Sequence, residues 1–325
     1  MVIAAVTAFV VLRSSIAPMP NIGAQSGMLA DPFSNPYPTD QSYIWWNWLS
    51  PFIAHLIGLR SSEEYSFFCL VIGLAILPCC YLALRSHIAT HAAVSWRLLL
   101  VACFPASFTG LFWVGMDSLT IVLLVLVVAA RRRPVLSAAL GILCGLQHAE
   151  QASVAIGLLV VGCLLLDRPA VRSALAAFVG VVTGRLILTV IAAHAGGAPL
   201  QTRYDYFFPR RGEFLHQFIS HAPTIIWSIF GAGWLVLLAT RLGRRTVGLL
   251  VLAVATALVL AMTSDDQTRV CAITTLPVLL LVFASPEFAA SRLRSQLVLP
   301  VGLLLPAVWV WKGHNRVPWP YPFVS

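Results

Sequence analysis

The sequence predicts an all-α polytopic membrane protein of about eleven transmembrane helices, and its composition is the main reason. Of the 325 residues, 59% are hydrophobic and only 10% are charged, and the mean hydropathy is +0.87. A soluble domain carries about 25% charged residues, so this chain cannot cover a water-facing surface. Its apolar content is also too high for a disordered chain. A soluble enzyme is therefore excluded.

Apolar segments follow one another along the whole chain. Met1 to about Ile16 is expected to be a first span, retained as an anchor because no basic region precedes it as in a cleaved signal peptide. The segment 134–147 is short, so we expect it to be tilted or to lie partly outside the lipid core. The ten expected spans after the first cover residues 65–84, 97–113, 116–130, 134–147, 152–166, 173–193, 223–240, 246–262, 270–285 and 296–311.

Two long connections interrupt the spans. Residues 14–64 form the expected first outer loop, and residues 14–41 within it hold five of the twenty prolines. Tyr43 to Leu59 is apolar and rich in tryptophan, which concentrates at the headgroup level, so an interfacial helix is expected there. Residues 194–222 form the expected second large outer loop. The whole chain, 1–325, is predicted to be one transmembrane domain without a soluble C-terminal domain.

The net charge of +9 indicates orientation, and nucleic acid is not an expected partner. Arginine clusters fall on alternate connections, as the positive-inside rule requires of cytoplasmic ones. The clusters are Arg85 with Arg97, Arg131 to Arg133, Arg168 with Arg172, Arg241 with Arg244 and Arg245, and Arg292 with Arg294. We therefore expect a multi-pass protein of the inner or plasma membrane, with its N-terminus inside and its C-terminus outside.

Ten of the twelve acidic residues lie on the predicted outer side. Most belong to a solvated rim, but Asp117, Glu150, Asp265 and Asp266 abut apolar spans, where an unpaired charge is costly. These four are candidate binding residues. His148 is a candidate ligand or acid–base group, and the alternative is a hydrogen-bonded turn histidine.

Metal and redox chemistry have little support. The seven cysteines all lie in apolar stretches and are expected to pack between helices. HExxH is absent, and no second histidine stands at helical spacing from His148, so no cofactor is predicted; a divalent metal is compatible with the acids but lacks a ligand motif. The aromatic stretch Tyr204–Phe208 is expected to be an interfacial anchor.

An acidic outer loop, an interfacial helix and many spans resemble the layout of the GT-C superfamily of integral-membrane glycosyltransferases. Residues 105–166 resemble a recurring block of that family, with an acidic residue opening a helix, a basic turn and a short polar outer turn. That turn is often T-R-P-E; here it is Gln147-His148-Ala149-Glu150, which keeps only the glutamate. Residues 264–280, SDDQTRVCAITTLPVLL, resemble a late block in which an arginine begins a helix.

The resemblance implies transfer of a sugar from a polyprenyl-phosphate donor to a lipid, glycan or protein acceptor, with inversion at the anomeric carbon. A carboxylate would take the acceptor proton, and Asp40 is the expected base with Asp31 as the second acid. The family commonly has these two acids close together, whereas here they lie nine residues apart. Asp40 has an alternative role as a helix cap.

Cations would hold the departing phosphate, and arginine suits this because its planar fork matches phosphate oxygens. The candidates are Arg269, Arg203, Arg210 and Arg211 on the predicted outer side. For Arg269 the alternative is an ion pair with Asp265 or Asp266. Two other function classes stay open: a transporter or flippase for an anionic lipid-linked substrate, and a non-catalytic membrane subunit with a protein partner.

Overall fold

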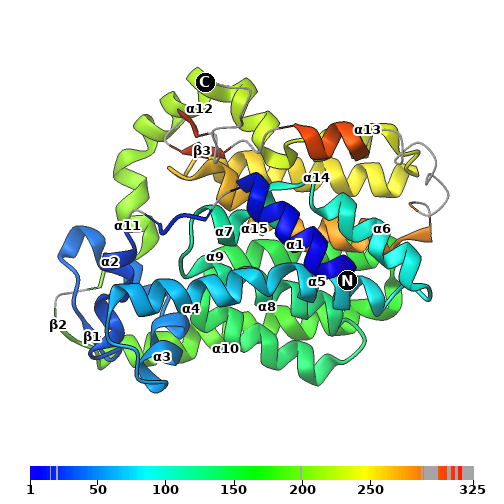
Figure 1. Ribbon diagram of the computed structural model, residues 1–325. Helices are drawn as coiled ribbons and strands as arrows, with labels where there is room; N and C mark the ends of the chain where they lie inside the picture. Colours follow the sequence, from blue (N-terminus) through cyan, green and yellow to red (C-terminus); the bar gives the residue numbers. More distant parts are fainter. Residues whose placement is uncertain are drawn as a thin grey trace.

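The computed structural model describes residues 1–14, 16–19, 21–197, 200–286, 288, 299–305, 309–311 and 314–316. The side chains of Thr39, Asp40 and Arg203, and those of residues 314–316, lie outside the described set. The described chain is almost entirely helical (Figure 1). Its helices are α1 (Val2–Ser14), α2 (Ile22–Gln25), η1 (Ser26–Leu29), η2 (Thr39–Trp46), α3 (Leu49–Leu56), α4 (Ser62–Leu74), α5 (Ile76–Arg85), α6 (His91–Val101), η3 (Pro105–Ser107), α7 (Thr109–Phe112), α8 (Asp117–Ala129), α9 (Pro134–Leu166), η4 (Arg168–Ala170), α10 (Val171–Ala193), α11 (Arg203–Phe207), η5 (Phe208–Arg210), α12 (Arg211–Phe230), α13 (Gly233–Ala239), α14 (Arg244–Ala261) and α15 (Gln267–Ala284).

Five helices are long and apolar enough to cross a membrane: Ser62–Arg85, Pro134–Leu166, Arg168–Ala193, Arg244–Ala261 and Gln267–Ala284. A sixth is added if α11 to α12 and α13, bent by 69°, count as one span. The described residues thus form the expected all-α architecture of a membrane protein, but fewer long spans than the eleven predicted. Several predicted spans are shorter helices of 10–17 residues, namely α1, α6 and α8.

Helix α9 is a hairpin of two halves. Its backbone leaves the helical region at His148 (φ −162°, ψ 73°). A straight helix of 33 residues would hold its ends about 50 Å apart. Instead, Arg131 before α9 and Asp167 after it form an ion pair, so the two halves fold back on each other. The predicted boundary between segments 134–147 and 152–166 falls at this break.

The first half of α9 runs parallel to α10 in close backbone contact. A Cβ added at Gly145 would lie 2.3 Å from the carbonyl oxygen of Val181, and one at Gly184 would lie 2.2 Å from that of Ile142. Small residues allow this approach, which is typical of helix packing within membranes. Helices α4, α8, α9 and α10 lie side by side (Figure 1). Helix α15 is buried along nearly all of its length, and it packs against α8, α9 and α14.

Local sequence explains how several elements begin. Ser61 and Glu64 form a capping box at α4: the Ser61 hydroxyl accepts from the Glu64 amide at 3.2 Å, and the Glu64 carboxylate accepts from the Ser61 amide at 3.1 Å. Pro51 lies in the first turn of α3, where its missing N–H costs no helix bond. The predicted interfacial helix 43–59 is therefore two pieces, η2 and α3.

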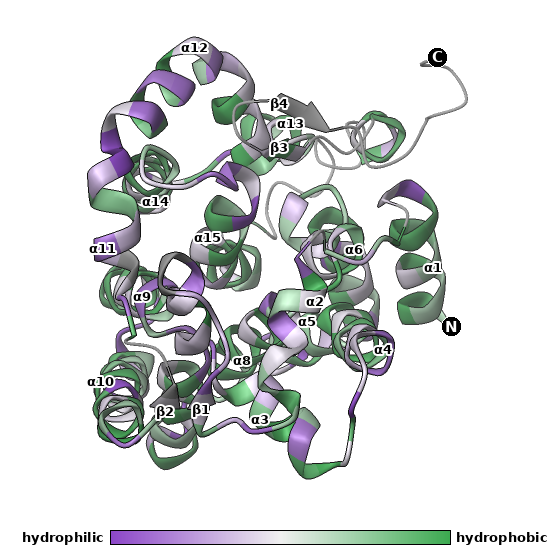
Figure 2. Ribbon diagram, turned by 90° about the vertical axis from the view of Figure 1, so that its left-hand side faces the viewer, coloured by the Kyte–Doolittle hydropathy of each residue, from purple (hydrophilic) through white to green (hydrophobic). Residues whose placement is uncertain are grey.

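Two predicted segments differ from the structure. Much of the predicted outer loop 194–222 is helical, because it contains α11, η5 and the first half of α12. Figure 2 shows hydrophilic residues gathered on α11 and the start of α12, which explains why the segment does not read as a span. The predicted span 296–311 ends in strand β3 (Trp309–Trp311), which pairs antiparallel with β4 (His314–Arg316). A second short pair, β1 (Ser34–Asn35) with β2 (Gly196–Gly197), joins the two predicted outer loops in parallel.

Candidate functional site

One cavity of about 390 Å³ gathers residues from five connections that the sequence assigns to the outer side. It is lined by Met19, Asn21, Tyr43, Trp113, His148, Glu150, Gln151, Tyr206, Phe207, Leu260, Thr263, Ser264, Asp265, Asp266, Arg269, Val270 and Trp311. His148 lies at the tip of the α9 hairpin, and the predicted inner residues Arg131 and Asp167 meet at the opposite end, beside the two termini of α9. The connections that the arginine pattern assigns to one side of the membrane therefore also lie together in the structure.

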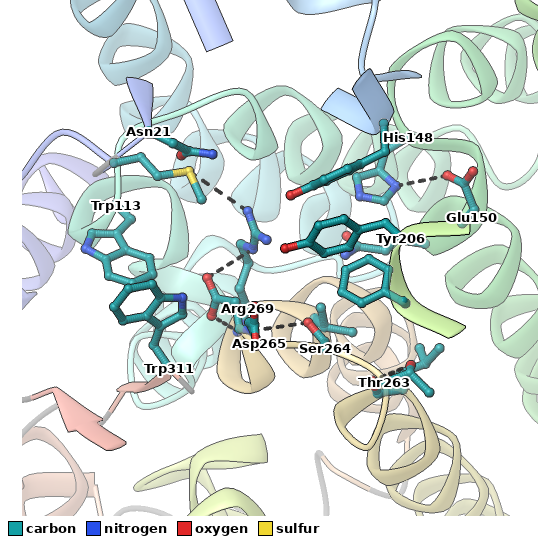
Figure 3. A pocket seen from close by; sticks show the side chains of 17 residues that line it. Asn21, Trp113, His148, Glu150, Tyr206, Thr263, Ser264, Asp265, Arg269 and Trp311 are labelled. Atoms are coloured by element: carbon teal, nitrogen blue, oxygen red, sulfur yellow. Dashed lines mark hydrogen bonds and ion pairs between the residues drawn. The ribbon is translucent and has the colours of Figure 1, made fainter. Parts of the chain in front are cut away.

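Aromatic rings flank the cavity on two sides (Figure 3). On one side Trp113, before α8, and Trp311 of β3 meet edge to face, with ring centroids 5.4 Å apart. On the other side the rings of Tyr43 and Tyr206 lie 4.4 Å apart, beside Phe207. The guanidinium of Arg269 lies between these two aromatic walls.

Arg269 is held by two carboxylates at the start of α15. Its Nε lies 3.2 Å from Asp266, which also caps the helix by accepting from the Arg269 amide. Its Nη1 forms an ion pair with Asp117, the first residue of α8. Its Nη2 makes no hydrogen bond to any side chain or carbonyl that the structure describes. The expected pairing with a neighbouring aspartate is confirmed for Asp266, and one amino group still faces the cavity.

Asp266 is almost completely buried, with 3% of its surface exposed. Burial raises the pKa of Asp266 to about 7, because the cost of desolvating its carboxylate exceeds the stabilisation from Arg269. Asp117 lies close enough to raise it further. The neighbouring Asp265 lines the cavity directly.

The break in α9 brings a second group of charges to the cavity. His148 Nδ1 lies 3.6 Å from Glu150, which lies 3.4 Å from Arg185 on α10. The Arg185 guanidinium stacks 3.8 Å from the centre of the Trp46 ring. The preceding Gln147 fixes the turn, since its side chain accepts from the Ser50 amide at 2.8 Å and donates to the Met116 carbonyl at 2.9 Å. Gln147 thus fixes the turn that carries His148 and Glu150, and Arg185 holds the Glu150 carboxylate in an ion pair.

The remaining predicted site residues differ in whether they reach the cavity. Arg210 contacts Tyr206, a cavity residue, while Arg211 donates to the Phe208 carbonyl and does not line the cavity. Asp31 is exposed and caps a turn by accepting from the Phe33 amide, so it does not line the cavity either. The side chains of Asp40 and Arg203 lie outside the described residues.

Tyr206 and Phe207 are cavity residues that the sequence assigned to an interfacial anchor. That interpretation fits only Tyr204 and Phe208, which are exposed and stack on each other at 4.8 Å. Their i, i+4 spacing places them on one face of the turn, and Tyr206, two positions from each, falls on the opposite face. Helical spacing was thus a signal for Tyr206, whereas it does not separate Phe207 from Tyr204, three residues before it.

Within the part of the chain that the structure describes, no group of three or more His, Cys, Asp or Glu side chains is placed to hold a metal ion. Comparison with protein-family models, curated proteins and solved structures finds no match to this chain.

Proposed function

We propose that this chain is an integral-membrane glycosyltransferase that moves a sugar from a polyprenyl-phosphate donor to a lipid, glycan or protein acceptor on the extracytoplasmic side. The observation that supports it most is the cavity itself, in which Arg269 lies between two aromatic walls and Asp265 and Asp266 also line the space. A GT-C-like arrangement of about eleven spans belongs to the same proposal.

The aromatic walls suit a sugar ring. The face of an aromatic ring carries partial negative charge, and the C–H groups of a sugar carry partial positive charge, so the two stack. Trp113 and Trp311 offer such surfaces on one side, and Tyr43 and Tyr206 on the other. Carboxylates between the walls, such as Asp265, would accept hydrogen bonds from sugar hydroxyls.

Arg269 suits the departing lipid phosphate. Negative charge grows on that phosphate as the glycosidic bond breaks, and a fixed guanidinium stabilises it without reorganising. Ion pairs with Asp117 and Asp266 hold the Arg269 side chain in place. Its Nη2 group, which has no partner among the described residues, is the part available to phosphate oxygens.

Asp40 remains the proposed general base that takes the acceptor proton. It belongs to η2, three residues before the cavity residue Tyr43. Direct displacement by the activated acceptor would invert the anomeric carbon. Asp31, in the same connection, is not proposed to share this role, because it caps an exposed turn away from the cavity.

The test is sugar transfer in membranes that contain the full-length chain, supplied with a panel of radiolabelled polyprenyl-phosphate sugars. We expect the wild type to label a membrane acceptor from at least one donor. Asp40→Asn should lower the rate roughly 100- to 10,000-fold, as loss of a general base does. Asp31→Asn is the matched control and should stay near wild type, since asparagine caps turns well. If no donor supports transfer, the proposed function is rejected. If Asp40→Asn is fully active, Asp40 is not the general base.

A further inference from the structure

We propose that Tyr206 donates a hydrogen bond to a phosphate group bound beside Arg269, and that Arg210 is a positioning residue that acts through Tyr206. The phosphate belongs to an isoprenoid lipid if the proposed function holds. The donor pair itself depends only on contacts at the cavity.

Arg210 is fixed by its own neighbour before it reaches Tyr206. Its Nε and Nη2 both donate to the Glu213 carboxylate at 3.2 Å, one turn along α12. Its Nη1 donates to the Tyr206 hydroxyl oxygen at 2.5 Å. Arg210 does not line the cavity, whereas Tyr206 does. A ligand in the cavity would therefore meet the phenol and not the guanidinium.

The contact with Arg210 determines what the Tyr206 hydroxyl does. A phenol oxygen can accept one hydrogen bond and donate another. Because Arg210 supplies a charge-assisted donor to that oxygen, the O–H bond is polarised and becomes a stronger donor. Such a hydroxyl favours a negatively charged acceptor. The Arg210–Glu213 pair carries no net charge, so its effect reaches the cavity through the phenol.

Tyr206 is also held in place as a donor. A capping box, Thr202 with Asp205, fixes the start of α11 just before it. Its ring packs between Tyr43 at 4.4 Å and Phe207 at 4.9 Å. Figure 3 shows its hydroxyl pointing toward Arg269. Tyr206 and the open Nη2 of Arg269 thus approach the same space from α11 and α15.

Two donors that converge on one space, one of them charged, match a tetrahedral oxyanion with oxygens on more than one side. Phosphate fits this arrangement, and the aromatic walls leave apolar surface for whatever the phosphate carries. The sequence alone pointed to Arg210 as a direct phosphate ligand, and the geometry replaces it with Tyr206.

The test is equilibrium binding of radiolabelled geranylgeranyl phosphate to the detergent-solubilised full-length protein. Tyr206→Phe keeps the ring and removes the hydroxyl, and it should weaken binding about 10- to 100-fold, as loss of a hydrogen bond to a charged group does. Tyr204→Phe is the matched control two residues away, exposed and outside the cavity, and should bind as the wild type does. Both variants should keep the wild-type melting temperature.

A double-mutant cycle tests the role of Arg210. Arg210→Gln should weaken binding about as much as Tyr206→Phe, and the double variant should be no weaker than Tyr206→Phe alone. Additive losses would mean that Arg210 contacts the ligand directly and would overturn its positioning role. Unchanged binding of geranylgeranyl phosphate by Tyr206→Phe would overturn the whole inference.

Competing ligands identify the source of the phosphate and separate this inference from the proposed function. Geranylgeraniol, which lacks the phosphate, should bind wild type and Tyr206→Phe equally weakly. Inorganic phosphate should compete only at far higher concentration. If it competes as strongly as the lipid does, Tyr206 and Arg269 still bind phosphate, but the ligand is free phosphate and not a lipid. If geranylgeranyl phosphate binding depends on Tyr206 but no donor supports sugar transfer, the proposed glycosyltransferase function is rejected and the phosphate site stands.

Discussion

Asp117 at the start of α8 and Arg269 at the start of α15 form an ion pair although 152 residues of sequence separate them. Both side chains are largely withdrawn from solvent, and Asp266 completes the cluster on the other side of the guanidinium. The cluster ties together two central helices of the bundle at the floor of the cavity. Arg269 therefore has a structural role as well as its proposed one.

Replacing Arg269 with glutamine should destabilise the protein, because it leaves Asp117 and Asp266 buried without a cation. Loss of one partner of a buried ion pair costs on the order of 3–5 kcal/mol. The melting temperature of the detergent-solubilised protein should fall clearly below that of the wild type. Adding Asp117→Asn to Arg269→Gln should recover part of the loss. A double variant no more stable than Arg269→Gln would contradict this account of the cluster.

Stability should fall as the pH rises through about 7. The folded-state pKa of Asp266 lies above its unfolded value of about 3.9, so the folded protein binds the proton more tightly. This contribution is fully present below about pH 4 and is lost by the time Asp266 ionises in the folded protein. Asp266→Asn keeps the helix cap and removes the titration, and should flatten the pH dependence of the melting temperature between pH 5 and about pH 8. A variant with the wild-type slope would assign that dependence to other groups.

The contact between α9 and α10 should not tolerate a methyl group. In Gly145→Ala, the new Cβ would lie 2.3 Å from the Val181 carbonyl oxygen, so the two backbones must separate. Overpacking of this kind costs about 1–3 kcal/mol. Gly157→Ala is the matched control on the same helix, since its Cβ meets only Phe178 at 3.9 Å. Melting temperatures should fall for Gly145→Ala only, and equal values would show that the helices adjust freely.

Long apolar runs were predictable from the sequence. The predicted segments 116–130, 173–193, 246–262 and 270–285 end within three residues of α8, α10, α14 and α15. Each run is long and predominantly apolar, with charged residues rare inside it, so hydropathy alone locates it. The segment 296–311 was predicted incorrectly at its end, because an apolar strand such as Trp309–Trp311 has the same composition as a helix.

The candidate site was predictable only in part. Asp265, Asp266 and Glu150 stood out because charges beside apolar spans are costly, and all three line the cavity. Arg269, expected as a phosphate ligand, and His148, expected as a ligand or acid–base group, line it too, whereas Asp117 pairs with Arg269 instead. The aromatic walls did not stand out, since tyrosine and tryptophan are common at membrane surfaces. The Asp117–Arg269 pair depends on the packing of α8 against α15, which no local pattern encodes.

The cavity should open to the extracytoplasmic side of the membrane. Gly212 and Thr263 are exposed near the cavity end, whereas Arg132, with 68% of its side chain exposed, lies at the opposite end of α9. Cysteines placed at residues 212 and 263 should react with a membrane-impermeant maleimide in intact cells. A cysteine at residue 132 should react only after permeabilisation.

The native cysteines should give little background, because six of them are buried and Cys79 is partly buried. The unsubstituted protein measures what remains. The arginine-rich connections predict this result, because the positive-inside rule places Arg131 to Arg133 in the cytoplasm. Labelling of residue 132 in intact cells, with residues 212 and 263 protected, would invert the topology. The cavity would then open to the cytoplasm, and a donor presented on the extracytoplasmic side would not reach Arg269.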